Sequence, residues 1–349
     1  MSLSSRSKEY WNFFIGECSR QKAPLYGLLT EGIKNDPYLS ALTARARPGQ
    51  PMANLILGAV HYLLLRGAEH PLRAYYQTLG GDAAPVADPF PIFRDFCRAH
   101  ESEIGTLIET RITNTNEAGR SAYLRAGFLT IASESGEPLH LIELGPSAGL
   151  NLHWDRYFYR YLMGGTEHPA GDENSRLVLT TQLEGKNLPP LGATPQIGMR
   201  VGLERDPVDL SHISARDWLK ALVWPDHPAR FQRLEQALEA TARLTLDIRK
   251  GDALDLLADA LAGAPRHGAL TVFHTLTTYQ FSKSDREGLE SILMTASLWR
   301  PIWRLSLEFS GGAYPLKLTR YHDGAITTRI LALCDPQGGA MEWRDEKSP

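Results

Sequence analysis

The feature that most constrains the fold is a short apolar run, Leu139 to Leu144, that leads directly into the sequence Gly145-Pro-Ser-Ala-Gly149. An apolar run of this length that ends in glycine is typical of a strand buried on both faces. Strand-like and helix-like patterns then alternate to the end of the chain, which favours parallel strands with helices on both faces. We therefore expect residues 136–349 to form a Rossmann-like α/β domain with a doubly wound, mostly parallel sheet.

Further strands of this domain are expected at 176–183, 197–203, 244–248, 269–273, 302–309, 316–321 and 325–333, and helices at 150–162, 230–244, 253–261 and 285–296. The last two strands are joined by Asp323-Gly324, a strong hairpin signal, so the sheet should end in an antiparallel hairpin. The Gly-, Pro- and acid-rich stretch 164–174 is predicted to be a loop, within an insertion at about 163–195.

The N-terminal third has a different pattern. Apolar residues recur at helical spacing in 10–18, 24–33, 52–65 and 92–100, and 101–132 is expected to form one or two longer helices. Period-2 alternation is absent before residue 138. We predict a helical domain over residues 1–135. His61 lies inside an apolar helix and is expected to be a hydrogen-bonded core histidine.

Composition narrows the function. A net charge of -3 and a pI of about 6.4 argue against a broad basic surface, and so against general nucleic-acid binding. Three dispersed cysteines and scattered histidines predict neither a disulfide framework nor a metal site. The sequence shows no signal peptide and no apolar run long enough for a membrane span. These features indicate a cytoplasmic protein. We expect its partner to be a small-molecule substrate.

The glycine-rich turn is the first candidate site. Glu143, Gly145, Ser147 and Gly149 form an acid followed by G-x-S-x-G, between an expected strand and an expected helix. Glycine permits positive φ and a close approach of the backbone, and the N–H groups at a helix start suit an anion. A tight turn without a ligand is the alternative interpretation.

Three acids follow the next two strands. Glu204 and Asp206 end the strand at 197–203, and Asp252 follows the strand at 244–248. A carboxylate after the second strand can accept ribose hydroxyls, and one after the third can accept an amino group of adenine. Taken singly, each acid is better explained as a solvated residue or a helix cap.

This arrangement resembles class I S-adenosylmethionine-dependent methyltransferases. The resemblance implies S-adenosylmethionine as cofactor, with the turn from Glu143 to Gly149 beneath it, Glu204 as the ribose acid and Asp252 as the adenine contact. Two departures are visible: Ser147 stands where the family usually has glycine, and the gap between Glu143 and Glu204 is long. The long gap leaves Asp206 as an alternative to Glu204.

Six segments in order also resemble an uncharacterised bacterial family catalogued as domain of unknown function 2332: residues 59–65, 70–72, 114–120, 143–157, 205–209 and 217–225. This resemblance covers nearly the whole chain. It implies a methyltransferase-like fold and assigns no reaction.

Two rival functions remain. The G-x-S-x-G sequence also matches the nucleophile elbow of α/β-hydrolases, with Ser147 as nucleophile, Asp252 or Asp206 as the acid, and His274 as the base. The helical upstream chain and the absence of an HGGG-like loop rank this reading second among the enzymes. A non-catalytic, nucleotide-sensing protein on the same fold is the other alternative.

Two further groups of polar residues are candidates. Asn114, Asn116, Glu117 and Arg120 form either an ordinary helix start or a lid in which Arg120 pairs with the cofactor carboxylate. His274 and Tyr279 follow the strand at 269–273, where methyltransferases face their substrate. His274 is then either a general base or a hydrogen-bonded strand-end residue.

Overall fold

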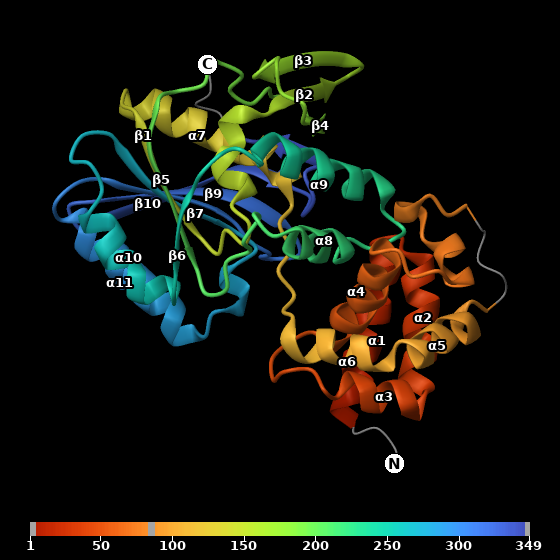
Figure 1. The fold of residues 1–349 in the computed structure, drawn as a ribbon. Helices are drawn as coiled ribbons and strands as arrows, with labels where there is room; N and C mark the ends of the chain where they lie inside the picture. The colour runs from red at the N-terminus through yellow and green to blue at the C-terminus, as the bar shows by residue number, and fades with distance from the viewer. Residues whose placement is uncertain (1–4, 83–87, 346–349) are drawn as a thin grey trace. The chain divides into compact units, whose positions relative to one another are not determined.

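The computed structural model describes residues 5–82 and 88–345, and the chain divides into two compact units (Figure 1). Unit 1 comprises residues 1–115 and 209–235, and unit 2 comprises residues 116–208 and 236–349. The division differs from the predicted boundary at residue 135. The helix before β1 packs on the sheet of unit 2, whereas Trp218 and Leu222 from the middle of the chain belong to the core of unit 1.

Helices form the described secondary structure of unit 1: α1(Ser5–Arg20), α2(Pro24–Asn35), α3(Pro37–Thr43), α4(Met52–Leu65), η1(Pro71–Tyr75), η2(Gln77–Leu79), α5(Phe90–Ala99), α6(Glu101–Thr110), α8(Ile213–Ala221) and the first half of α9(Pro228–Thr241). His61 is fully buried on α4, where its ring contacts the carbonyl of Ala221 and the hydroxyl of Thr78. Burial lowers the pKa of His61 to about 4. It is the satisfied core histidine that the sequence predicts.

Unit 2 is built on one sheet with the strand order β3-β2-β4-β11-β10-β9-β8-β7-β1-β5-β6. Its strands are β1(Leu139–Leu144), β2(Phe158–Met163), β3(Thr166–Gly171), β4(Val178–Glu184), β5(Ile197–Glu204), β6(Asp247–Lys250), β7(Ala269–Thr275), β8(Ile302–Leu307), β9(Tyr314–His322), β10(Ala325–Cys334) and β11(Ala340–Trp343). Among the described residues, six of the ten strand pairings are parallel. The predicted α/β class, the mostly parallel sheet and the terminal β9–β10 hairpin are confirmed.

Opposite faces of the sheet carry different helices. α7(Ser121–Ser135) packs on the face that presents Leu305, since Gly127 lies against that side chain. α11(Lys283–Ser297) lies on the other face, where its Glu290 binds Arg304 of β8, and α10(Ala253–Ala262) lies beside it. Within the described ranges, no helix is both long enough and apolar enough to cross a membrane.

Several predicted elements are wrong. Residues 150–162 form the short helix η4(Leu150–Arg156) and then β2, because Tyr159 and Tyr161 are buried while Arg160 between them is exposed. This spacing of two is that of a strand. The predicted loop at 164–174 contains β3, which pairs with β2. By contrast, the prediction of one or two helices over 101–132 is confirmed, since α6 and α7 lie there with η3(Ala118–Arg120) between them.

The packing of α7 on β8 can be tested at Gly127. A Cβ atom at this position would lie 2.6 Å from Leu305 Cδ1. We expect Gly127→Val to lower the free energy of unfolding by about 1–3 kcal/mol through overpacking, measured by urea denaturation. Gly288→Ala on α11 is the control, because its Cβ would meet Leu254 at 3.8 Å, an ordinary contact. Equal stability of the Gly127→Val variant and the wild type would show that α7 packs differently.

Candidate functional site

The order in which the chain adds parallel strands to the sheet reverses at β1. β1 pairs in parallel with β5 along one edge and with β7 along the other, so the chain continues to opposite sides of it. Ligands of open α/β sheets bind beyond the carboxyl ends of the strands at such a switch point. Here β1 leads into the predicted turn, where Gly145, Ser147 and Gly149 have φ values of 67°, 55° and 76°. The turn is therefore placed where a ligand site is expected.

Two buried polar atoms beside this turn have no hydrogen-bond partner among the described residues: Glu143 Oε2 and Ser147 Oγ. Burial, and secondly the negative charge of Glu204, raise the pKa of Glu143 to about 8, although the charge of Arg120 and a contact with Asn151 act against this. Unpartnered buried polar atoms are costly, typically about 1–3 kcal/mol each. Both atoms are available to a ligand that can reach the turn.

The predicted acids gather at the carboxyl ends of β5 and β6, where they stabilise local structure. Glu204 accepts hydrogen bonds from the backbone N–H groups of Ser147 (2.8 Å) and Asp206 (3.2 Å). Asp252 caps α10 by accepting from Leu254 N–H and pairs with Arg205 at 2.7 Å. Asp206 is exposed beside Glu204. The strand ends thus bring these carboxylates to one edge of the sheet.

The polar group before α7 leads into a short helix. Asn116 and Glu117 precede η3, and the backbone of Glu117 is extended. Asn116 accepts a hydrogen bond from Leu150 N–H, and Glu117 caps η3 by accepting from Gly119 N–H. Arg120 donates to the carbonyls of Pro336 and Thr275. Asn114 falls in unit 1, so the structure assigns it to a different compact unit from the other three.

A cavity of about 480 Å³ lies at the carboxyl ends of β7 and β8 in unit 2. Its lining is mostly polar and includes both predicted residues, His274 and Tyr279. The other charged and hydroxyl side chains that line it are Thr278, Arg286, Glu290, Arg304, Ser306, Glu308, Ser310, Lys317, Thr319, Tyr321 and Thr328.

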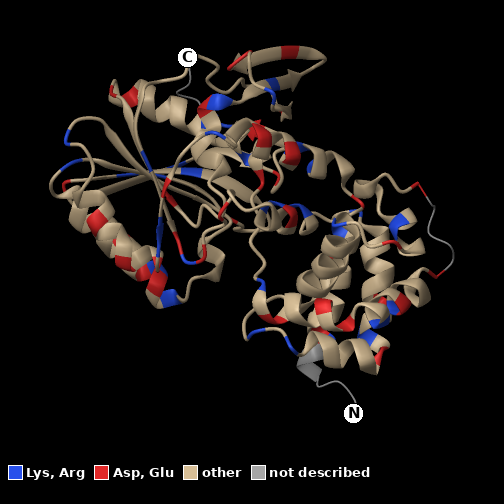
Figure 2. Ribbon diagram, in the orientation of Figure 1, with Lys and Arg blue, Asp and Glu red and all other residues tan. Residues whose placement is uncertain are grey.

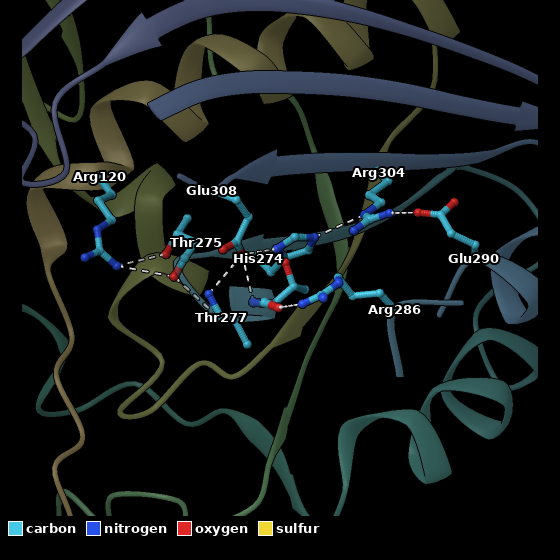
Figure 3. A network of polar contacts seen from close by, with 9 residues as sticks. Arg120, His274, Thr275, Thr277, Arg286, Glu290, Arg304 and Glu308 are labelled. Carbon is cyan, nitrogen blue, oxygen red and sulfur yellow. Dashed lines mark hydrogen bonds and ion pairs between the residues drawn. The ribbon is translucent and has the colours of Figure 1, made fainter. Parts of the chain in front are cut away.

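A network of polar contacts centred on His274 forms one wall of this cavity (Figure 3). His274 is fully buried; its Nδ1 lies 2.6 Å from Glu308 Oε1, and Arg304 Nε lies 3.1 Å from its Nε2. Because a guanidinium can only donate, Nε2 accepts and the proton of the neutral ring is on Nδ1. Arg304 continues to Glu290, which also accepts from the Tyr321 hydroxyl at 2.7 Å.

The pKa values of this pair follow from burial and mutual contact. Burial lowers the pKa of His274, and the bond to Glu308 only partly offsets this. Burial alone would raise the pKa of Glu308, but the hydrogen bonds from His274 and from the N–H groups of Thr278 and Thr277 bring it below its ordinary value. A general base must offer a free lone pair to its substrate, and Arg304 occupies the one on His274. His274 is therefore a positioning residue of the network.

The cavity exists because one face of β7 and β8 changes character along the strands. Leu270, Val272 and Ile302 belong to the apolar core beneath α10 and α11. On the same face, His274 follows Val272 by two residues and Arg304 follows Ile302 by two residues. Both of these polar side chains line the cavity. The positive charge of the cavity lining comes from Arg304 and Lys317 on the strands and from Arg286 on α11, a helix with more acidic than basic residues (Figure 2).

The segment after β7 connects the cavity with the glycine turn. Leu276 has a φ of 50°, an unusual conformation for a leucine, and its N–H donates to the carbonyl of Leu307. Glu308 Oε1 holds the next residues by accepting from Thr277 N–H and Thr278 N–H, each at 2.9 Å. A Cβ on Gly145 would lie 2.6 Å from Thr277 Cγ2. Glu308 thus positions the side chain that covers the turn.

The sequence reasoning missed most of the residues that line this cavity, including Arg304, Glu308 and Lys317. The signal was present as period-2 alternation: Arg304, Ser306 and Glu308 alternate with the buried Leu305 and Leu307. Such alternation predicts one apolar and one polar face of a strand.

The structure does not form the serine-hydrolase triad. Ser147 Oγ has no partner among the described residues, and both ring nitrogens of His274 are engaged by Glu308 and Arg304. Asp252 is bound to Leu254 N–H and Arg205. The hydrogen bonds that link nucleophile, base and acid in a triad are therefore replaced by other contacts.

These features define an α/β protein whose polar residues gather at the carboxyl edge of a mostly parallel sheet. A family model described as "Uncharacterized protein conserved in bacteria (DUF2332)" matches residues 11–343, and the chain belongs to that family. The resemblance of the six sequence segments is thereby confirmed. A search of curated proteins finds no match to the chain. In the described part of the chain, no three metal-ligating side chains cluster.

The raised pKa of Glu143 predicts a pH-dependent stability. Between its ordinary value of 4.5 and about 8, the folded protein holds a proton that the unfolded chain releases. The contribution of this residue to the free energy of unfolding is therefore full below pH 4.5, falls by about 1.4 kcal/mol per pH unit in the window, and is lost above pH 8. Glu143→Gln should gain stability relative to the wild type as pH rises, measured by urea denaturation. Glu287→Gln, exposed on α11, is the control, and parallel curves for Glu143→Gln and the wild type would contradict the assignment.

The tautomer of His274 is also testable. We expect a neutral ring with its proton on Nδ1 at pH 6.5, the ordinary pKa of histidine, because burial disfavours the charged form. Long-range ¹H–¹⁵N NMR correlations distinguish the two nitrogens. An imidazolium signal that titrates around pH 6.5 would refute the arrangement of Glu308 and Arg304 described above.

Proposed function

We propose that the protein is an S-adenosylmethionine-dependent methyltransferase that acts on a small molecule. The observation that carries the proposal is the switch point at β1, with a glycine-rich turn of positive φ directly after it. The cofactor would supply an electrophilic methyl group. The contribution of the chain would be to bind and align the two reactants.

The order of the central strands supports a Rossmann-like, methyltransferase-like fold. Read across the sheet, β6-β5-β1-β7-β8 is the order 3-2-1-4-5 when these five strands are numbered along the chain. This is the order of doubly wound dinucleotide-binding folds. In the sequence, β2 to β4 lie between β1 and β5. In the sheet, they lie at the edge beyond β11, so they leave this central order intact.

The residues around the turn suit an adenosyl ligand with an amino-acid tail. Glu143 Oε2 and Ser147 Oγ are polar, buried and unpartnered among the described residues. Asp252 would take the adenine amino group at the end of β6. At the end of β5, Glu204 would accept the ribose hydroxyls, with the exposed Asp206 beside it as the alternative.

Calorimetric titration with S-adenosylmethionine and S-adenosylhomocysteine tests the proposal. We expect micromolar binding by the wild type, about -8 kcal/mol. Asp252→Asn should weaken it while keeping the α10 cap, since asparagine caps as well as aspartate. Gly145→Ala should abolish it, because its Cβ would collide with Thr277 Cγ2 at 2.6 Å.

Matched controls separate binding from folding. Gly164→Ala has a similarly positive φ of 55° but no atom within 4 Å, so it should bind normally. Asp285→Asn, in the capping box of α11, is the control for Asp252→Asn. Absence of binding to either ligand by the folded wild type would defeat the proposal. Binding without methyl transfer to any small molecule would favour the nucleotide-sensing alternative.

A further inference from the structure

The cavity at the carboxyl ends of β7 and β8 contains one carboxylate oxygen and one ammonium group that have no partner among the described residues. Glu308 Oε2 is buried and has no hydrogen-bond partner among the described residues. Lys317 lines the same cavity and makes no ion pair with any described residue. Glu308 therefore presents an open acceptor, and Lys317 presents an open cationic donor.

The register of the sheet places these two groups close together. Ser306 of β8 lies opposite Lys317 of β9, and Glu308 follows Ser306 by two residues. Glu308 and Lys317 are therefore diagonal neighbours on one face, a separation of roughly 7–8 Å between Cα atoms. Side chains of this length could close such a gap. Glu308 is instead held by His274 and by the N–H groups of Thr277 and Thr278.

The same cavity is also lined by hydroxyl groups of Ser306, Thr319 and Tyr321. The other charged side chains are already engaged. Arg304 is bound to His274 and Glu290, and Arg286 donates to the carbonyls of Thr278 and Phe281. Glu308 Oε2 and Lys317 are thus the negative and the positive group that lack a side-chain partner among the described residues, and Arg286 adds a positive charge that is held by carbonyls.

The combination of Glu308 Oε2 and Lys317 favours some classes of ligand over others. A phosphate or a simple carboxylate would satisfy Lys317 but place negative charge near the unpartnered Glu308 oxygen. A simple amine would satisfy Glu308 and leave Lys317 unpaired. A molecule that carries both an ammonium and a carboxylate satisfies both groups through charge-assisted hydrogen bonds.

We propose that this cavity binds a small zwitterion, an amino acid or a close derivative, with its ammonium on Glu308 and its carboxylate on Lys317. Binding is inferred from the cavity alone. Its role as the methyl acceptor rests on the proposed function, which the Thr277 segment supports by touching both the cavity network and Gly145.

The experiment is a thermal unfolding assay of the full chain without cofactor. The probes are a millimolar mixture of the twenty proteinogenic amino acids, a mixture of matching carboxylic acids without the amino group, a mixture of matching amines, and inorganic phosphate. We expect the amino acids to raise Tm by about 2–4 °C and the other probes to have little effect. Single amino acids then identify the ligand, and calorimetry gives its affinity.

Variants locate the binding. Lys317→Met should fold normally, because Lys317 has no ion pair to lose among the described residues, and should weaken the amino acid by about tenfold or more. Glu308→Gln should weaken it too. Lys283→Met is the matched control, since Lys283 is exposed on α11 and pairs with Glu287 outside the cavity lining. It should bind as the wild type does.

The outcomes separate this inference from the proposed function. A Tm unchanged by the amino acids, a shift equal to that with amines or acids alone, or a shift that survives Lys317→Met would overturn it. Stabilisation by phosphate alone would mark a plain anion site instead. Titration of Lys317→Met with S-adenosylmethionine should match the wild type, whereas Asp252→Asn should lose the cofactor and keep the amino acid.

Discussion

Parallel pairing of β1 along both edges fixes where chemistry can occur in unit 2. All six residues of β1 are buried, and its neighbours β5 and β7 run in the same direction. The carboxyl ends of β1, β5, β6, β7 and β8 therefore lie at one edge of the sheet. Their terminal polar residues are brought to that one edge, although they lie far apart in sequence. The candidate turn and the cavity are both consequences of this direction.

The carboxylate of Glu308 connects the candidate turn with the cavity. Glu308 Oε1 accepts from His274 and from two consecutive backbone N–H groups, which holds the segment after Leu276 in place. Thr277 in that segment packs over Gly145. Glu308, which follows β8, therefore helps to position the turn after β1. A ligand on the free Glu308 oxygen would act on the same carboxylate. Glu308 and Thr277 thus connect the cavity lining with the turn after β1.

The sequence allowed most of the sheet to be predicted and only part of the site. Buried strands such as β1 and β7 are uniform apolar runs, and the Asp323-Gly324 hairpin has its own local signal. β2 was mistaken for a helix because its aromatic residues satisfy both periods over so short a length. The predicted acids Glu204 and Asp252 are at the expected edge, but their hydrogen bonds to the Ser147 N–H group and to Arg205 depend on contacts across 57 and 47 residues.

The sequence by itself determined the class of fold, the hairpin and the position of the glycine turn, because periodicity and turn chemistry are local properties of the chain. Only the tertiary structure decided which polar residues share a site. Glu308 and Lys317 face one cavity because antiparallel pairing sets β8 against β9, and the pKa of His274 is lowered because the fold buries it beside Arg304. Register, burial and the field of distant charges are properties of the folded chain. They depend on residues far apart in the sequence, so they cannot be predicted from a short segment of it.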